Sequence, residues 1–308
     1  MDLRAPRLLA AALFLVLLAL AAWPRAARAD TQMCTVIDTL PATLAVPGHY
    51  CLDQDFAQSF SSAAAIEISA DDVVLDCNDH VIRATNNANT VTGIYGTSQR
   101  SNVEVRNCTL DNAYVGIFFT GSSEPGAVGN RIVGNAVLRA RTVGIYVIGS
   151  NNLVEGNRVA QLSANVNGVG YGIFLYSPLA QGVGNVIRGN HIGDVRPTPP
   201  GDGNPIYGIK FFNVRSTEVS GNTVAGVYAT TNWGAWGIHA SQTSHNMIVG
   251  NTVLSPPPAA APYDGSQYGG IRVDGTVEEQ ATTVCRDNVV GHFNAGIAGC
   301  VQFDNTEF

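Results

Sequence analysis

The stretch Val154-Glu-Gly-Asn157-Arg-Val159 places one apolar residue three positions before an asparagine and another two positions after it. Four further stretches repeat this pattern: Ile132-Val-Gly-Asn135-Ala-Val137, Ile187-Arg-Gly-Asn190-His-Ile192, Val219-Ser-Gly-Asn222-Thr-Val224 and Ile248-Val-Gly-Asn251-Thr-Val253. Degenerate copies lie around Asn78, Cys108 and Asn288, and the eight anchors are on average 30 residues apart. A period in this range is typical of an architecture in which each repeat stacks on the next.

The two apolar positions around each asparagine cannot share one helix face, but they fit two short strands that meet at a bend. Asparagine tolerates the left-handed backbone conformation of such a bend, and its amide can bond the same groups in the coils above and below. The pattern predicts an all-β fold, a single-stranded parallel β-helix of about eight to nine coils with an internal asparagine ladder. A second column supports this fold, because Gly-Ile pairs recur once per coil at 93–94, 116–117, 144–145, 172–173, 208–209, 237–238, 270–271 and 296–297.

The first residues have the pattern of an export signal. Arg4 and Arg7 precede an apolar run from Leu8 to Ala22, and a small-x-small cleavage site ends at Ala29. Because the run is short and ends in a cleavage site, it favours a secretory signal peptide over a membrane anchor. We expect a signal peptide at 1–29, an N-terminal cap at 30–64, and a β-helix domain at 65–308 that ends in a capping segment. The protein is then exported to the periplasm or the extracellular medium, without membrane insertion, and the alanine-rich signal is typical of bacteria.

The net charge of the exported chain restricts its partners. Cleavage after Ala29 leaves 13 basic and 23 acidic residues, a net charge of −10, which argues against nucleic acid and anionic membranes as partners.

Six cysteines in an exported chain permit disulfides. We expect the pairs Cys34–Cys51, Cys77–Cys108 and Cys285–Cys300. The alternative is that some of these cysteines are buried free thiols. No Cys-x-x-Cys or His-rich spacing indicates a metal site, and no cofactor is expected.

Strand alternation assigns a direction to each side chain of the Gly-Ile strands. The isoleucine and the residue two positions later point inward, so the residue between them points outward. On three consecutive coils this outward position holds Lys210, the only lysine of the chain, then His239 and Arg272, with Asp274 close by. The same face is expected to carry aromatic residues from earlier coils and from long connections, namely Tyr146, Phe174, Tyr176, Trp233, Trp236 and Tyr263.

A face with aromatic and cationic side chains suits an extended polysaccharide, because sugar rings stack on aromatic faces and cations bind acidic sugars. There is also a structural interpretation, since outward aromatic residues form ladders on β-helices and stabilise neighbouring coils. In that case Lys210 is a solvated lysine and His239 is an ordinary surface histidine. The pattern predicts no particular oligomeric state.

The N-terminal part carries a resemblance to a known superfamily. The stretches Gly48-His-Tyr-Cys-Leu, Ile66-Glu-Ile and Val73-Val-Leu-Asp-Cys-Asn78-Asp-His80-Val-Ile82 resemble the opening of secreted proteins of the pectate-lyase-like superfamily, which includes NosD-type proteins. The resemblance implies a right-handed β-helix. The sequence lacks the polygalacturonase motifs, the alginate-epimerase signature Asp-Pro-His-Asp-Arg-Ser and the acidic calcium cluster of pectate lyases. None of those activities can therefore be transferred residue by residue.

Two functional hypotheses follow. In the first, the protein is a carbohydrate-active enzyme, with a uronate-directed lyase as the favoured class. Arg272 then binds the uronate carboxylate, Lys210 or His239 is the base, and Tyr176 is the acid. Neighbouring cations are expected to lower the pKa of Lys210. In the second, the protein is a non-catalytic β-helix that binds a glycan or serves as an envelope scaffold.

Overall fold

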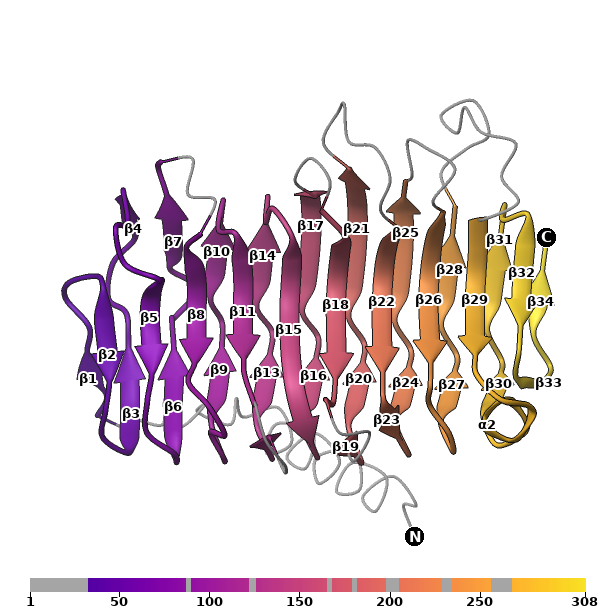
Figure 1. The fold of residues 1–308 in the computed structure, drawn as a ribbon. Coiled ribbons are helices and arrows are strands. Elements are labelled where there is room, and N and C mark those ends of the chain that lie inside the picture. Colours follow the sequence, from indigo (N-terminus) through magenta and orange to yellow (C-terminus); the bar gives the residue numbers. More distant parts are fainter. Residues whose placement is uncertain are drawn as a thin grey trace, which may run out of the picture. The chain divides into compact units, whose positions relative to one another are not determined.

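The computed structural model describes residues 33–86, 90–121, 126–164, 168–178, 182–197, 205–228, 234–255 and 268–308. The signal peptide expected at 1–29 lies outside these residues. Residues Cys34–Phe308 form one compact unit. In this unit short strands follow one another around successive coils and pair in parallel with strands of the neighbouring coils (Figure 1). The unit is a parallel β-helix, as the repeat predicts.

The coils share three long sheets. Sheet 1 contains the Gly-Ile strands and has the order β2 (Ala42–Leu44), β5 (Ala64–Ile68), β8 (Thr92–Gly96), β11 (Val115–Phe119), β15 (Val143–Ser150), β18 (Gly170–Tyr176), β22 (Ile206–Phe212), β26 (Ala235–Ser241), β29 (Tyr268–Asp274) and β32 (Ala295–Ala298), with β12 (Ala127–Val128) beside β15.

Sheet 2 precedes the asparagine of each repeat. Its order is β1 (Thr35–Val36), β3 (Gly48–Cys51), β6 (Val73–Asp76), β9 (Glu104–Arg106), β13 (Arg131–Val133), β16 (Leu153–Glu155), β20 (Val186–Arg188), β24 (Glu218–Ser220), β27 (Met247–Val249), β30 (Val284–Arg286) and β33 (Val301–Phe303). A separate pair joins β19 (Gly182–Val183) and β23 (Val214–Arg215).

Sheet 3 follows the asparagine. Its order is β4 (Phe56–Gln58), β7 (Val81–Ala84), β10 (Thr109–Asp111), β14 (Ala136–Leu138), β17 (Arg158–Ala164), β21 (His191–Pro197), β25 (Thr223–Val227), β28 (Thr252–Leu254), β31 (Val289–Gly291) and β34 (Thr306–Glu307).

The stack is longer than the eight to nine coils that the anchors suggested, because the described strands form sheets of 11, 11 and 10 members. The extra strands lie at the two ends, where the repeat pattern is weakest. Strands β1 to β4 come from the segment expected to be an N-terminal cap, and they pair with β3, β5, β6 and β7 in all three sheets. At the other end, Glu307 accepts a hydrogen bond from the amide of Ile297, on the terminal strand β32.

The glycines of the Gly-Ile column are fixed by close packing. A Cβ atom at Gly208 would lie 2.3 Å from Cγ1 of Val224 in sheet 3 and 2.6 Å from the carbonyl oxygen of Gly237 on the next coil. The isoleucine that follows, Ile209, is fully buried. Glycine and isoleucine are therefore both directed toward the core, so strict alternation is broken at the glycine, and the residue before it emerges on the outer face.

The asparagine ladder is present at the bend between sheets 2 and 3. From Asn135 onward, the backbone amide and the Nδ2 group of each asparagine donate to Oδ1 of the next, through Asn157, Asn190, Asn222, Asn251, Asn288 and Asn305. The left-handed conformation lies at the preceding residue, for example Gly189 with φ of 62°. Asparagine is therefore used for its amide rather than for its backbone tolerance.

A second ladder runs along the bend between sheets 1 and 2. Asn130 donates to Asn152, and Asn152 donates to Asn185, through both the backbone amide and Nδ2. Threonine takes the equivalent place at Thr217, where the hydroxyl oxygen is buried without a hydrogen-bond partner. Each member lies five residues before a member of the first ladder, so the sequence repeat contains a signal for the second ladder as well.

Three disulfides join Cys34 to Cys51, Cys77 to Cys108, and Cys285 to Cys300, which confirms the expected pairs. The amide of Cys108 donates to Oδ1 of Asn135, so the second disulfide extends the first ladder toward the N-terminus. Among the described residues, helix α2 (Val277–Ala281) is far too short to cross a membrane, and no other helix there is long and apolar enough.

Candidate active site

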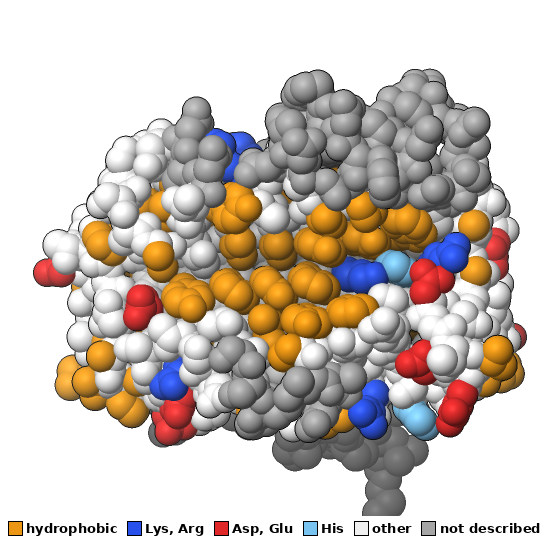
Figure 2. All heavy atoms as spheres, in the orientation of Figure 1, with side chains coloured by type: hydrophobic (Ala, Val, Ile, Leu, Met, Phe, Trp, Pro, Cys, Tyr) orange, Lys and Arg blue, Asp and Glu red, His pale blue; other side chains and the backbone are white. Residues whose placement is uncertain are grey.

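Three basic side chains line up on the outward face of sheet 1. The register pairs Lys210 of β22 with His239 of β26, and His239 with Arg272 of β29. It also pairs Ser241 with Asp274. Basic, histidine and acidic side chains gather where a broad hydrophobic band ends (Figure 2). The fold therefore brings together four of the side chains that strand alternation placed on one face.

These side chains form a continuous hydrogen-bonded chain. Nζ of Lys210 lies 2.6 Å from Nδ1 of His239 and donates to Oγ of Ser241 at 2.9 Å. Nε2 of His239 lies 2.8 Å from Oδ2 of Asp274, and Nε of Arg272 donates to the other carboxylate oxygen at 2.7 Å. Both oxygens of Asp274, a residue expected to contact substrate, are thus engaged within the protein.

The charges fix the direction of each hydrogen bond. Hydrogen bonds from His239 and Arg272, together with the charge of Arg272, lower the pKa of Asp274 to about 2, against the opposing effect of burial. Asp274 is therefore an acceptor, so Nε2 of His239 carries the hydrogen. Burial, the largest cause, lowers the pKa of His239, so the ring is neutral and Nδ1 is an acceptor. Lys210 therefore donates to Nδ1.

Burial changes the acidity of Lys210. Its side chain is only 8% exposed, and Nζ lies 4.9 Å from the centre of the Tyr207 ring. Burial lowers the pKa of Lys210 to about 8, against the opposing effect of the Asp274 charge. The direction agrees with the sequence-based expectation, but the cause does not, because desolvation rather than neighbouring cations lowers this pKa.

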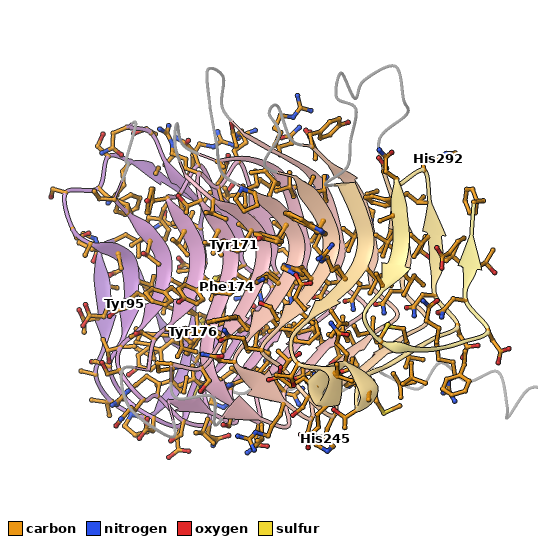
Figure 3. The ribbon with its side chains drawn as sticks, turned by 45° about the vertical axis from the view of Figure 1, so that its right-hand side comes forward. Tyr95, Tyr171, Phe174, Tyr176, His245 and His292 are labelled. Carbon is orange, nitrogen blue, oxygen red and sulfur yellow. A yellow bond between two sulfur atoms is a disulfide. The ribbon has the colours of Figure 1, made fainter. Side chains whose placement is uncertain are left out.

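An array of stacked aromatic rings borders the cluster. Its members are Tyr95, Phe118, Tyr146 and Phe174 in a central column, Tyr171, Tyr207 and Trp236 on one side, and Tyr176 and Phe212 on the other. Figure 3 shows Tyr171, Phe174 and Tyr176 of β18 at the same face of the sheet. Trp236 also stacks on His239, with ring centres 5.4 Å apart.

The ring planes limit what this array can bind. Tyr146 lies between Phe118 and Phe174, at centroid distances of 4.7 and 4.8 Å and interplanar angles of 9° and 22°. This spacing equals the distance between coils, so the rings cover one another's faces. A sugar ring can therefore meet Tyr146 only at its edge, and the stacking on exposed ring faces that the sequence suggested is unavailable there.

Sequence reasoning missed that Tyr171 and Tyr207 point outward from sheet 1. Both come directly before a glycine of the Gly-Ile column, where the break in alternation turns them outward. The ring of Tyr207 stacks on His239 at 5.2 Å and helps to bury Lys210. The sequence did carry a signal for this position. On three consecutive coils an aromatic residue directly precedes the glycine, namely Tyr171, Tyr207 and Trp236. Trp233 and Tyr263 lie outside the described residues.

The hydrogen-bond chain divides the chemical roles. Both ring nitrogens of His239 are occupied, and the residue is 6% exposed, so it orients and accepts protons rather than meeting a substrate. Lys210 has two hydrogen-bond partners and retains a third tetrahedral position. The side chain of Arg272 is 48% exposed and available to an anion. Within the described ranges, no three His, Cys, Asp or Glu side chains are placed to hold a metal ion.

Fold and site together define a parallel β-helix protein with a buried lysine–histidine–aspartate chain on its outer face. A family model described as the right handed beta helix region matches residues 59–224, and the chain belongs to this family. No curated protein matches the sequence.

Solved structures similar to the chain share little sequence with it. The A-module of a mannuronan C-5 epimerase of Azotobacter vinelandii is 12% identical, with 86% of this chain and 91% of that chain covered and a TM-score of 0.32. DFA-IIIase from Arthrobacter chlorophenolicus is 13% identical, with coverages of 83% and 64% and a TM-score of 0.48. The Dettilon tailspike protein is 14% identical, with coverages of 89% and 60% and a TM-score of 0.44. The chain spans less than two thirds of the last two proteins.

Proposed function

We propose that this is an exported carbohydrate-active protein that cleaves an acidic polysaccharide by β-elimination, with Lys210 as the base. The observation that carries the proposal is the Lys210 amine, buried and held by the His239–Asp274 pair beside the half-exposed guanidinium of Arg272. Three disulfides support an oxidising compartment. Together with the export signal expected at 1–29, they favour the periplasm or the extracellular medium.

Each step of the elimination has a group in the cluster or in the aromatic array that borders it. Arg272 pairs with the uronate carboxylate, which stabilises the charge that develops when the C5 proton leaves. The lone pair of neutral Lys210 takes this proton, and the electrons of the C5–H bond form the C4–C5 double bond as the C4–O bond breaks. Tyr176 donates a proton to the leaving oxygen. Tyr207 is the second candidate for this acid, because burial raises its pKa and keeps its hydroxyl protonated.

This assignment fixes the pH dependence. The base acts as a neutral amine, so kcat/KM should rise with pH and level off above the Lys210 pKa of about 8. His239 stays neutral throughout this range because burial lowers its pKa.

The experiment is mass spectrometry of digests of a panel of uronate-rich and neutral polysaccharides. Oligosaccharides that lack one water per chain are the expected products. Lys210→Met should abolish turnover and Arg272→Ala should reduce it at least tenfold. Arg188→Ala is the matched control for Arg272→Ala, because Arg188 is an equally exposed arginine paired with Glu155 on sheet 2. Turnover by the Lys210→Met protein, or fully hydrated products, would contradict the lyase proposal.

The second candidate is glycan binding without turnover, or an envelope scaffold. The observation that favours it is the aromatic array: its rings stack on one another as a structural ladder does, which supports a scaffold, and a glycan would meet the edges of the rings. It predicts saturable binding and an untouched panel. Trp236→Ala should then weaken the binding at least tenfold, whereas an unchanged affinity would contradict a binding role for this face.

A further inference from the structure

The Lys210 amine is surrounded by groups that suit the attack of an amine on a carbonyl group. Tyr207 and Phe212 of β22 flank it with aromatic rings, at 4.9 and 6.0 Å from Nζ to the ring centres. From β26, His239 and Ser241 meet Nζ itself. From β29, the carboxylate of Asp274 is bonded to His239 and Arg272 rather than to the amine.

Among the described residues, no carboxylate makes the direct contact that normally keeps a buried lysine inert. A direct carboxylate partner would hold the ammonium form, but the hydrogen-bond partners of Nζ are a neutral imidazole and a hydroxyl. On β18 the register neighbour is the apolar Phe174. The amine can therefore lose its proton to His239 without breaking an ion pair.

We propose that Lys210 forms an imine with small aldehydes, including the open-chain aldehyde of reducing sugars. This activity uses the amine of the proposed function, but it does not require cleavage of a polysaccharide. It adds a covalent carbonyl-binding site to the outer face of sheet 1.

The reaction balances with the groups present. The lone pair of Nζ attacks the carbonyl carbon, a C–N bond forms, and the π electrons of the carbonyl move to oxygen. Nδ1 of His239 takes one N–H proton and returns it to this oxygen, which gives the neutral carbinolamine. Loss of the hydroxyl group together with the remaining N–H proton then yields the imine and one water. Asp274 stabilises the imidazolium that forms between these steps.

The single lysine makes the test specific. The full-length exported protein is incubated at pH 7 with glycolaldehyde and sodium cyanoborohydride, which reduces an imine by hydride addition to carbon and leaves a stable hydroxyethyl amine. Peptide mass spectrometry then gives the modification rate at Lys210. The same chain unfolded in urea is the reference, and the α-amino group in each sample is an internal control.

We expect Lys210 to react at least tenfold faster in the folded protein than in the unfolded chain. With a pKa of about 8, roughly one amine in ten is neutral at pH 7, about 200-fold more than for an ordinary lysine. His239→Gln removes the proton acceptor and should lower the folded-state rate at least fivefold. The matched control is His191→Gln, on an exposed histidine of sheet 3, and it should change nothing.

An equal or slower rate in the folded protein would overturn the imine proposal. The result is independent of the polysaccharide panel. Faster labelling of Lys210 without cleavage of any polysaccharide would support the imine site and overturn the lyase proposal. Cleavage of a polysaccharide without faster labelling would support the lyase and overturn the imine site.

Discussion

Lys210 illustrates how its surroundings change the chemistry of a single side chain. An exposed lysine is a solvated cation, whereas here the amine is buried beside Tyr207 and bonded to a neutral histidine. The charged form therefore loses hydration and gains no direct carboxylate partner from the described part of the chain, and burial lowers the pKa to about 8. The same burial that makes the amine a candidate base must reduce the stability of the fold at neutral pH.

This cost gives a pH-dependent stability. Between pH 8 and about 10.4, the unfolded chain binds a proton at Lys210 that the folded protein does not bind. The free energy of unfolding of the native protein, relative to Lys210→Met, should therefore rise by about 3 kcal/mol over this window and stay level below it. Urea unfolding of both proteins at several pH values measures the difference. A difference independent of pH would contradict a lowered pKa for Lys210.

At the level of the strand, the glycine column determines how closely the coils approach. Gly208→Ala should destabilise the protein by about 2–3 kcal/mol or prevent folding, because the new methyl group overlaps Val224 and the Gly237 carbonyl. Gly193→Ala is the control, because a Cβ atom there has no neighbour closer than 3.6 Å. It should be neutral or stabilise by up to about 1 kcal/mol. Thermal unfolding distinguishes the two, and equal effects would contradict the packing argument.

The second asparagine ladder contains a weak point at Thr217. Its hydroxyl oxygen is buried without a partner, between Asn185 and Asn246 of the neighbouring coils. In Thr217→Asn, the new Oδ1 should accept from Asn185 and the new Nδ2 should donate to Asn246. The gain should be about 1 kcal/mol in the free energy of unfolding. A loss of stability in denaturant unfolding would show that the bend at this coil cannot accommodate the amide.

The strands were largely predictable from the sequence, for a physical reason. Repeated burial of the same positions imposes a period that asparagine and Gly-Ile columns make visible, and the observed register follows these columns. The first coil was not predictable, because β2 lacks the Gly-Ile pair and lies in the segment expected to be a cap. The outward turn of Tyr207 was also hidden, because it depends on a break in alternation that only the packing of Gly208 against Val224 explains.

The candidate site was predictable as a list of residues but not as a chemical system. Alternation and coil spacing placed Lys210, His239 and Arg272 in one line. The hydrogen bond between His239 and Asp274 could not be predicted from the sequence. The two residues are offset by two positions in the register of neighbouring strands, so their side-chain rotamers decide whether they meet. The burial of Lys210 could not be predicted either, because it depends on the position of the Tyr207 ring.

For the molecule as a whole, the disulfides lie toward the two ends of the β-helix, and the first asparagine ladder runs from its middle to its C-terminal coils. Because each coil contacts only its neighbours, unfolding can start from an end. Each disulfide should contribute about 2–4 kcal/mol. Reduction should therefore lower hydrogen-exchange protection at least tenfold in β3 to β10 and in β30 to β34, while β16 to β25 keep theirs. Uniform loss of protection would indicate one cooperative unit instead.

The fold holds Lys210 as an amine that can become neutral near physiological pH. The most direct test is a pH titration by NMR of protein labelled with ¹³C at the lysine ε-carbon, which gives one lysine signal because the chain has one lysine. The titration midpoint of Lys210 should lie near pH 8. It should move to lower pH in Asp274→Asn, because the charge that raises the Lys210 pKa is removed. A midpoint near the ordinary lysine value of about 10.4 would show that the fold does not lower the pKa of Lys210.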